Sequence, residues 1–398
     1  MNFYGYPRSD GRAGVRNYVL VLPASMCASD TANSIAAQVQ GAVSFHNQVG
    51  CSQVPSDMQY ALDMMAGFAA NPNVYGTVLV AIGCETCQCD MVAAEIRKRT
   101  DKPLESFIIR QEGGTLRTVE KAVRAARAMA AEASRLQKQP IPISQLLLAT
   151  ECGGSDPTSG IAANPVIGAL SDRIVAQGGG VILSETTEFI GAEDILVKRA
   201  ATPEVRQRIL DIVGRYEEHF LRCGENVRLG NPTPGNIAGG LTTLEEKSLG
   251  CIHKGGESII QAVYDYAKPI PVEQKGLVIM DTPGNDASSM AGMAAGGAQG
   301  GVRGQPGGVQ LGVAARQVKP ADVIRQSRVG QWAEKAQLRA VVPQCLQRFG
   351  VGKAERGVPC HGKAHPRRGH RARHSGGRGA VKQGVQQRPV DGLLRGIG

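Results

Sequence analysis

The sequence has no run of about 18 consecutive apolar residues, the length that a membrane-spanning helix needs. Its first six residues, MNFYGY, also lack the basic stretch followed by apolar residues that is typical of a signal peptide. These two absences argue against a membrane protein and against secretion. The sequence therefore predicts a soluble, cytoplasmic protein without a membrane partner.

A cytoplasmic location also argues against a disulfide scaffold, although the chain has 10 cysteines among its 398 residues. Reducing compartments keep thiols free for metal binding or catalysis. Some of these cysteines can equally be small buried hydrophobic residues. Composition alone leaves both alternatives open.

Acidic residues are scarce in the last hundred residues. Residues 299–398 contain 19 Lys and Arg against 4 Asp and Glu, whereas residues 1–298 contain 26 against 31. Three interpretations compete for this basic Gly/Arg/Gln-rich tail: a segment that binds nucleic acid, a disordered solvating extension, or the product of a shifted reading frame near residue 299. Nucleic-acid binding is disfavoured because the tail has almost no aromatic residues for base stacking.

Between residue 15 and about residue 295, short apolar runs alternate with helical patterns. This order predicts an α/β fold with mainly parallel sheets covered by helices on both faces. The expected strands are 18–22, 42–45, 76–82, 106–109, 145–149, 181–184 and 276–280. The expected helices are 29–39, 56–69, 88–99, 115–137, 161–176, 203–221, 256–267 and 286–294.

Turn-forming residues divide this pattern. Lys138-Gln139-Pro140-Ile141-Pro142 cannot be helical, so we expect a first α/β domain at 1–140 and a second at 141–298. The stretch 229–249 contains too many Gly, Pro and Asn residues for an ordinary connection, and long loops in α/β cores are usually functional. Residues 299–398 form the atypical tail.

Several expected strands end in polar residues, and ligands of open α/β sheets bind beyond the carboxyl ends of the strands. Glu85, Glu151 and Glu185 each follow or end an apolar run, and Asp281 ends another. Gly153 and Gly154 allow close backbone approach, while Ser155 or Asp156 could cap a following helix whose N-terminus favours a substrate carboxylate. Four such strand ends predict one common crevice.

The cysteines at 84, 87 and 89 have the spacing of a metal knuckle, but a structural zinc site needs a second pair of ligands, which is missing before the tail. A redox Cys-x-x-Cys motif is also possible, although it usually opens a helix near the start of a thioredoxin-like domain. His46 and Cys51 follow an expected strand and suit a borderline transition metal. His219 fits a solvated surface position, and His253 is a weak candidate.

In this order, the motifs resemble the altronate/galactarate dehydratase family, specifically its large C-terminal region. The matching segments are 11–17, His46 with 50–53, 83–85, 113–115, 151–156, 184–188, 230–236, 239–248 and 281–284. The resemblance covers about residues 5 to 298. It implies a hydro-lyase that depends on Fe²⁺ or Mn²⁺ and converts a sugar acid to a 2-keto-3-deoxy acid.

The resemblance also implies roles for individual residues. Glu85, Glu151 and Glu185 are the candidate acid and base, and His46, Cys51, Cys84 and Cys152 are expected around one metal crevice, only some of them as direct ligands. Further residues are expected to contact the substrate: Gly153, Gly154, Ser155, Asp156, Asn231, Asn236, Lys247 and Asp281. A metal would stabilise the enediolate that forms beside the substrate carboxylate.

Full-length family members carry a small N-terminal domain, and this chain begins where that domain should already have ended. Because some members are split into two subunits, we expect a separate small subunit and an oligomer. One split relative, a sulfolactate sulfo-lyase, expels sulfite instead of water and supplies the alternative activity. An alternative of another class is a non-catalytic thiol or metal-binding protein, for which Cys87 and Cys89 should matter as much as Cys84.

Overall fold

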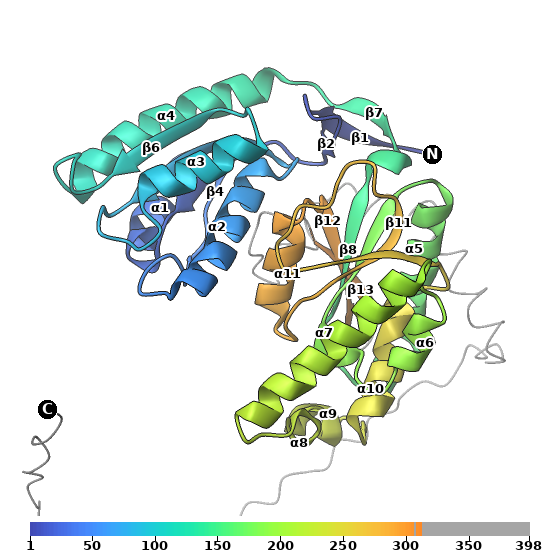
Figure 1. Cartoon of the computed structure of the whole chain (residues 1–398). Helices are drawn as coiled ribbons and strands as arrows, with labels where there is room; N and C mark the ends of the chain where they lie inside the picture. The colour runs from blue at the N-terminus through green and yellow to red at the C-terminus, as the bar shows by residue number, and fades with distance from the viewer. Residues whose placement is uncertain (306–307, 313–398) are drawn as a thin grey trace, which may run out of the picture. The chain divides into compact units, whose positions relative to one another are not determined.

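The computed structural model describes residues 1–305 and 308–312 (Figure 1). The predictions for the tail beyond residue 312 lie outside this part of the chain. Within it, the structure confirms the predicted α/β class: two separate sheets consist mainly of parallel strands, and helices cover them. No described helix is both long enough and apolar enough to cross a membrane.

The first sheet has four parallel strands in the order β4-β3-β5-β6. The strands are β3 (Tyr18–Pro23), β4 (Ala42–Val43), β5 (Val74–Ala81) and β6 (Leu104–Ile108). Successive side chains of a strand point to opposite faces. Val19 and Val21 therefore pack with α1 (Ser29–Ala36) and α4 (Thr115–Arg135), whereas Leu20 and Leu22 pack with α2 (Pro55–Ala70) and α3 (Cys89–Arg99).

The second sheet has six strands in the order β10-β11-β9-β8-β12-β13. They are β8 (Leu147–Cys152), β9 (Gly180–Leu183), β10 (Ile260–Tyr264), β11 (Gly276–Met280), β12 (Gly300–Gln305) and β13 (Gly308–Gly312), and only β13 runs antiparallel to its neighbour. One face packs against α5 (Asn164–Ala176), α6 (Glu193–Val197) and α7 (Pro203–Arg222), and the other against α11 (Asp286–Ala295). β12 extends this sheet beyond residue 298, into the segment predicted as tail.

The predicted strands and helices recur with small shifts, with one exception. The helix predicted at 256–267 is wrong, because Ile260–Tyr264 is strand β10, which pairs in parallel with β11. Strands β1 (Asn2–Pro7), β2 (Ala13–Gly14) and β7 (Gln139–Pro142) were not predicted; they form a small antiparallel sheet that includes the Pro-rich segment near residue 140.

The turn-rich stretch 229–249 contains short helices. α8 (Val227–Gly230), α9 (Pro234–Ala238) and α10 (Leu244–Cys251) each begin after a capping side chain, supplied by Asn226, Thr233 and Thr243. Such caps satisfy backbone N–H groups that lack partners at a helix start. The segment is therefore ordered by local capping and lies beside the second sheet, where α10 leads into η5 (Ile252–Gly255).

Candidate active site of the second sheet

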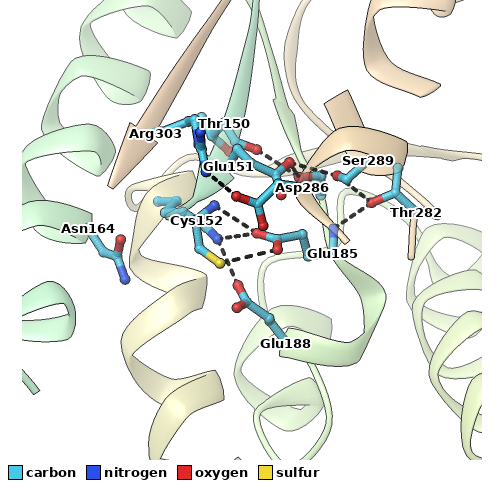
Figure 2. Close-up of polar contacts among 12 residues, drawn as sticks. Thr150, Glu151, Cys152, Asn164, Glu185, Glu188, Thr282, Asp286, Ser289 and Arg303 are labelled. Carbon is cyan, nitrogen blue, oxygen red and sulfur yellow. Dashed lines mark hydrogen bonds and ion pairs between the residues drawn. The ribbon is translucent and has the colours of Figure 1, made fainter. Parts of the chain in front are cut away.

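Three neighbouring parallel strands, β11, β9 and β8, end side by side in the second sheet. Glu151 and Cys152 are the last residues of β8, Glu185 follows β9, and Thr282 follows β11. Figure 2 shows their side chains pointing toward one another. The structure thus brings together two of the three predicted acid–base glutamates and one predicted metal ligand.

Glu151 is fully buried, and its two carboxylate oxygens have different surroundings. Oε2 accepts hydrogen bonds from Ser289 Oγ at 2.7 Å and from Ser184 Oγ at 3.2 Å. Oε1 has no hydrogen-bond partner among the described residues. Burial, together with the negative charge of Glu185, raises the pKa of Glu151 well above its usual range. Glu151 therefore holds a proton easily, or needs a cation beside it.

Glu185 lies at the centre of the cluster in a left-handed backbone conformation, with φ 68° and ψ 74°. This conformation is uncommon for a residue other than glycine, and such strain is concentrated at functional sites. Its backbone N–H donates to Thr282 Oγ1 at 2.7 Å, and its Oε2 accepts from the N–H of Cys152 at 2.8 Å. The Cys152 thiol donates to Oε1 at 3.2 Å. These bonds hold the strained residue and its carboxylate in one position.

Lys254, in η5, is fully buried and joins two carboxylates of this cluster. Its Nζ donates to Glu185 Oε2 at 2.9 Å and to Glu188 Oε2 at 2.8 Å. Burial alone would lower the pKa of Lys254, but these two carboxylates raise it well above its usual range. Burial alone would likewise raise the pKa of Glu188, but Lys254 and Lys247 hold it well below its usual range. The three side chains therefore form a buried, charged network.

Sequence reasoning did not select Lys254 or Glu188. Glu188 lies in the matched segment 184–188, so the motif was the available signal for it. Lys254 follows His253 in a short polar turn, and nothing local indicates that its side chain is buried. Lys247 was predicted as a substrate contact, and its Nζ lies 3.4 Å from Glu188 Oε1 and donates to Asn231 Oδ1 at 3.0 Å.

A pocket of about 230 Å³ adjoins this network. Lys247 and Cys251 line the pocket, and both also contact Glu188, Lys247 through the ion pair above and Cys251 through a side-chain hydrogen bond. Ser155 and Asp156 also line the pocket, and the α9 residue Asn236 donates to the backbone oxygen of Ser155 at 2.9 Å. The pocket therefore presents the ammonium group of Lys247 to an acidic ligand, and this ammonium group lies beside the ionised carboxylate of Glu188.

The other predicted substrate contacts lie around the same strand ends. The N–H of Gly153 donates to the backbone oxygen of Gly304 at 2.5 Å, and Gly154 accepts from Ser159 Oγ at 3.3 Å through its carbonyl. Asp281 accepts from Thr186 Oγ1 at 2.6 Å and from Arg215 at 2.6 Å. All these residues come from the second sheet and its connections.

Two groups of side chains in this cluster could hold a metal ion, because their ligand atoms lie within 4.8 Å of one another. They are Cys152 with Glu185 and Glu188, and Glu151 with Glu185 and Asp286. In the first group, Lys254 already donates to both carboxylates. The second group contains the unpartnered Oε1 of Glu151, while Lys254 donates to Glu185 and Arg303 forms an ion pair with Asp286.

The remaining predicted site residues belong to the first sheet. Glu85 is buried, and its carboxylate accepts from the N–H groups of Ile82, Gly83 and Cys84 and from Ser25 Oγ. Although burial would raise its pKa, these backbone bonds lower it. Cys51 and Cys84 are exposed, and the His46 ring contacts Asn33 at 3.1 Å. The two candidate metal groups found among the described residues contain none of these residues.

Comparison with known proteins agrees with this division of the chain. Residues 143–306 match the family described as D-galactarate/altronate dehydratase, C-terminal, and residues 5–134 match the D-galactarate dehydratase/altronate hydrolase second domain. The chain belongs to the altronate/galactarate dehydratase family. The resemblance predicted from the motifs is thereby confirmed.

Curated relatives of this dehydratase-family chain include enzymes with different activities. The altronate dehydratase of Bacillus subtilis is 34% identical over 310 residues, which are 75% of this chain and 61% of that enzyme. The beta subunit of (2R)-sulfolactate sulfo-lyase from Chromohalobacter salexigens is 37% identical over 268 residues, 67% of this chain and 68% of that subunit. The altronate dehydratase of Escherichia coli is 30% identical over 306 residues, which are 73% of this chain and 60% of that enzyme. The chain thus spans about three fifths of the altronate dehydratases that it matches.

Proposed function

We propose that this chain is the large catalytic part of a metal-dependent hydro-lyase that converts a sugar acid, such as altronate or galactarate, to a 2-keto-3-deoxy acid. The observation that carries the proposal is Glu188, an ionised buried carboxylate held between Lys254 and Lys247, where Lys247 lines a pocket. Such an elimination requires a base beside a cation that binds the substrate carboxylate. The family membership supports the same reaction class.

Lys247 is the proposed partner of the substrate carboxylate. Its bond to Asn231 and its ion pair with Glu188 orient the ammonium, and its side chain is largely buried. A charge-assisted hydrogen bond is strong where water is excluded. The substrate hydroxyls would then face the polar wall of Ser155, Asp156 and Ser159.

Glu188 is the proposed base for the proton beside the substrate carboxylate. In the free chain, Lys254 and Lys247 hold the pKa of Glu188 low, which makes it a weak base. A bound carboxylate shares the charge of Lys247 and adds negative charge near Glu188, and both changes raise the pKa of Glu188. The base would therefore become stronger only when substrate is present.

Glu151, Glu185 and Asp286 would hold the Fe²⁺ or Mn²⁺ ion that the family resemblance implies, since these metals accept carboxylate ligands. When bound, the ion supplies Lewis-acid stabilisation for negative charge that develops on the substrate. Lys254 acts as a positioning residue, because it fixes the carboxylates of Glu185 and Glu188 relative to each other.

The decisive experiment compares Glu188→Gln with wild type in formation of 2-keto-3-deoxy acid from altronate and galactarate. Fe²⁺ or Mn²⁺ and the proposed small partner subunit are supplied. Loss of a general base should lower kcat by about 10²- to 10⁴-fold. Glu218→Gln, which changes an exposed carboxylate of α7, is the matched control and should retain activity. A Glu188→Gln enzyme with kcat near that of wild type would refute the assignment.

A second candidate is the elimination of sulfite from sulfolactate. It is favoured by the 37% identity to a sulfo-lyase beta subunit, of which this chain covers 68%. The same pocket cation would bind the carboxylate, and the same base would remove the adjacent proton. Measuring sulfite release from sulfolactate in parallel with keto-acid formation separates the two activities. Sulfite release without turnover of the sugar acids would favour the second candidate.

A further inference from the structure

The pocket beside Lys247 has more negative than positive side chains in its lining. Lys247 is the only Lys or Arg among the described residues that line it, and its ammonium already lies 3.4 Å from Glu188 Oε1. Two carboxylates, those of Asp156 and Glu246, line the same pocket. The pocket therefore has one cation for an anionic group of a ligand, and no second cation for a second anionic group.

Hydrogen bonds keep both pocket carboxylates ionised at neutral pH. Thr158 Oγ1 donates to Asp156 Oδ1 at 2.6 Å, and this bond, together with bonds from Ser159, lowers the pKa of Asp156. The hydroxyl and the backbone N–H of Thr242 donate to Glu246 Oε2 at 2.5 and 2.8 Å and lower the pKa of Glu246. Both side chains therefore carry a full negative charge when a ligand enters the pocket.

Two further basic residues in this region do not compensate these charges. His253 lines the pocket, but burial and the charge of Arg199 lower its pKa, so the imidazole is largely neutral at neutral pH. Lys254, the next residue, is fully buried, and its ammonium donates to Glu185 and Glu188. Neither side chain therefore offers a positive charge to a ligand in the pocket.

Two uncharged residues of the pocket wall use their hydrogens within the protein. Asn164 Nδ2 donates to the carbonyl oxygen of Gly250 at 3.0 Å, and because a carbonyl can only accept, this bond fixes the orientation of the amide. Asn164 Oδ1 is buried without a partner among the described residues. The Ser159 hydroxyl donates to Asp156 Oδ1 at 3.0 Å or to the carbonyl oxygen of Gly154 at 3.3 Å. These groups, like the carboxylates, therefore suit ligand hydroxyls, which donate, better than a second carboxylate.

We propose that the pocket selects a monocarboxylate: a polyhydroxy acid with its one carboxylate at Lys247 and an uncharged, hydroxylated end beside Asp156 and Glu246. The proposal rests on the proposed function, which places the substrate carboxylate at Lys247, and narrows its substrate class. Like charges brought together without a counter-ion disfavour the wrong ligand. Altronate, with one carboxylate, is therefore favoured over galactarate, with two, and over sulfolactate, with a carboxylate and a sulfonate.

Calorimetric titration of the metal-free full chain tests the selection on pairs of acids that differ only at the far end. Altronate is paired with the aldarate of the same configuration, which carries a second carboxylate in place of CH₂OH. Galactarate is paired with galactonate, which carries CH₂OH in place of one carboxylate. Each monocarboxylate should bind at least about 10-fold more tightly than its dicarboxylate. This preference should shrink in 1 M NaCl, where the Debye length is only about 3 Å.

Charge-removing variants test whether the two pocket carboxylates cause the preference. Asp156→Asn and Glu246→Gln each keep an acceptor oxygen, and each should reduce the preference by roughly 3- to 10-fold. Glu218→Gln, which removes an exposed carboxylate of α7 outside the pocket, is the matched control and should leave the preference unchanged. Thermal unfolding verifies that each variant is folded, and the salt dependence of wild type tests the same electrostatic cause without any substitution.

The outcomes for the selection and for the proposed function are distinguishable. Equal affinity within both pairs, a preference that neither variant reduces, or no binding of either monocarboxylate overturns the selection. Keto-acid formation is measured separately, with Mn²⁺ added. Tight binding of the monocarboxylates without any turnover would count against the proposed function and leave the selection intact. Turnover of both members of a pair with equal kcat/KM would refute the selection and support the function.

Discussion

Replacing Lys254 with Met should destabilise the protein strongly, and more at pH 8 than at pH 5. The ammonium group has bonds of 2.9 and 2.8 Å to Glu185 and Glu188, and all three side chains are buried. Removing one partner of a buried ion pair costs about 3–5 kcal/mol, because the remaining charge is left uncompensated. For a domain of about 150–250 residues, the size of the part built on the second sheet, that corresponds to a fall in Tm of roughly 6–20 °C.

The pH dependence follows from the direction of the pKa change at Glu188. In wild type, Lys254 and Lys247 hold this pKa below its unfolded value, so the contribution of Glu188 to stability is fully present at both pH 5 and pH 8. In Lys254→Met, burial is opposed only by Lys247 and by the hydrogen bond from Cys251, so we expect the folded pKa of Glu188 to rise above its unfolded value. Stability is then lost as the pH rises through that folded value. The deficit should therefore grow from pH 5 to pH 8.

The assay is thermal and urea unfolding of both proteins at the two pH values, without added metal. Lys98→Met, which removes an exposed ammonium from an i,i+3 pair, is the control and should change stability by less than about 1 kcal/mol. The double variant Glu188→Gln with Lys254→Met should lose less than the sum of the single losses. A loss below about 1 kcal/mol for Lys254→Met, or an equal loss at both pH values, would refute the buried network.

Four further predictions concern other parts of the chain. Wild type should lose stability as the pH falls below about 4.3, because the depressed pKa of Glu188 contributes stability above that value. Glu188→Gln should make this loss smaller. An equal loss of urea-unfolding free energy at acid pH in both proteins would contradict this. Lys247→Met should raise KM roughly 10- to 100-fold, the equivalent of about 1.5–3 kcal/mol for a lost charged hydrogen bond, and steady-state kinetics will detect it. Mn²⁺ at about 100 times its Kd should stabilise wild type by about 2.7 kcal/mol in calorimetry but not Glu151→Gln, and equal stabilisation would place the metal elsewhere. Gly168→Ala should cost about 1–3 kcal/mol in urea unfolding because its Cβ would lie 2.1 Å from a backbone oxygen of η5, whereas Gly214→Ala, with open space in α7, should be neutral or stabilising.

Much of the fold was predictable because strands and helices leave different periodic patterns. β3 and β5 are nearly continuous apolar runs, as expected for strands buried on both faces. In α4, buried residues recur at three- and four-residue intervals, at Thr118, Ala122, Ala126 and Met129. The wrong helix at 256–267 shows the limit of local pattern: Ile260–Tyr264 becomes a strand because β11 supplies its parallel partner.

The sequence by itself determined the family, the alternation of strands and helices, and the presence of acidic residues at strand ends. It placed Glu151 and Cys152 at the end of β8 because an apolar run stops there. It could not separate Glu85 from Glu151, since both follow apolar runs and lie beside a cysteine. Only the pairing of strands assigns them to different sheets, where Glu85 binds backbone N–H groups and Glu151 meets Glu185.

Tertiary structure alone decided which charges are buried together. Lys254 lies in a short polar turn that suggests a solvated position. Its side chain nevertheless binds Glu185 and Glu188, which are 69 and 66 residues away in the sequence. The free energy of an ion pair depends on distance and on desolvation, and neither quantity exists until the chain is packed. Sequence can therefore indicate which residues are able to carry charge and chemistry, whereas the fold determines their partners, and through them their pKa values.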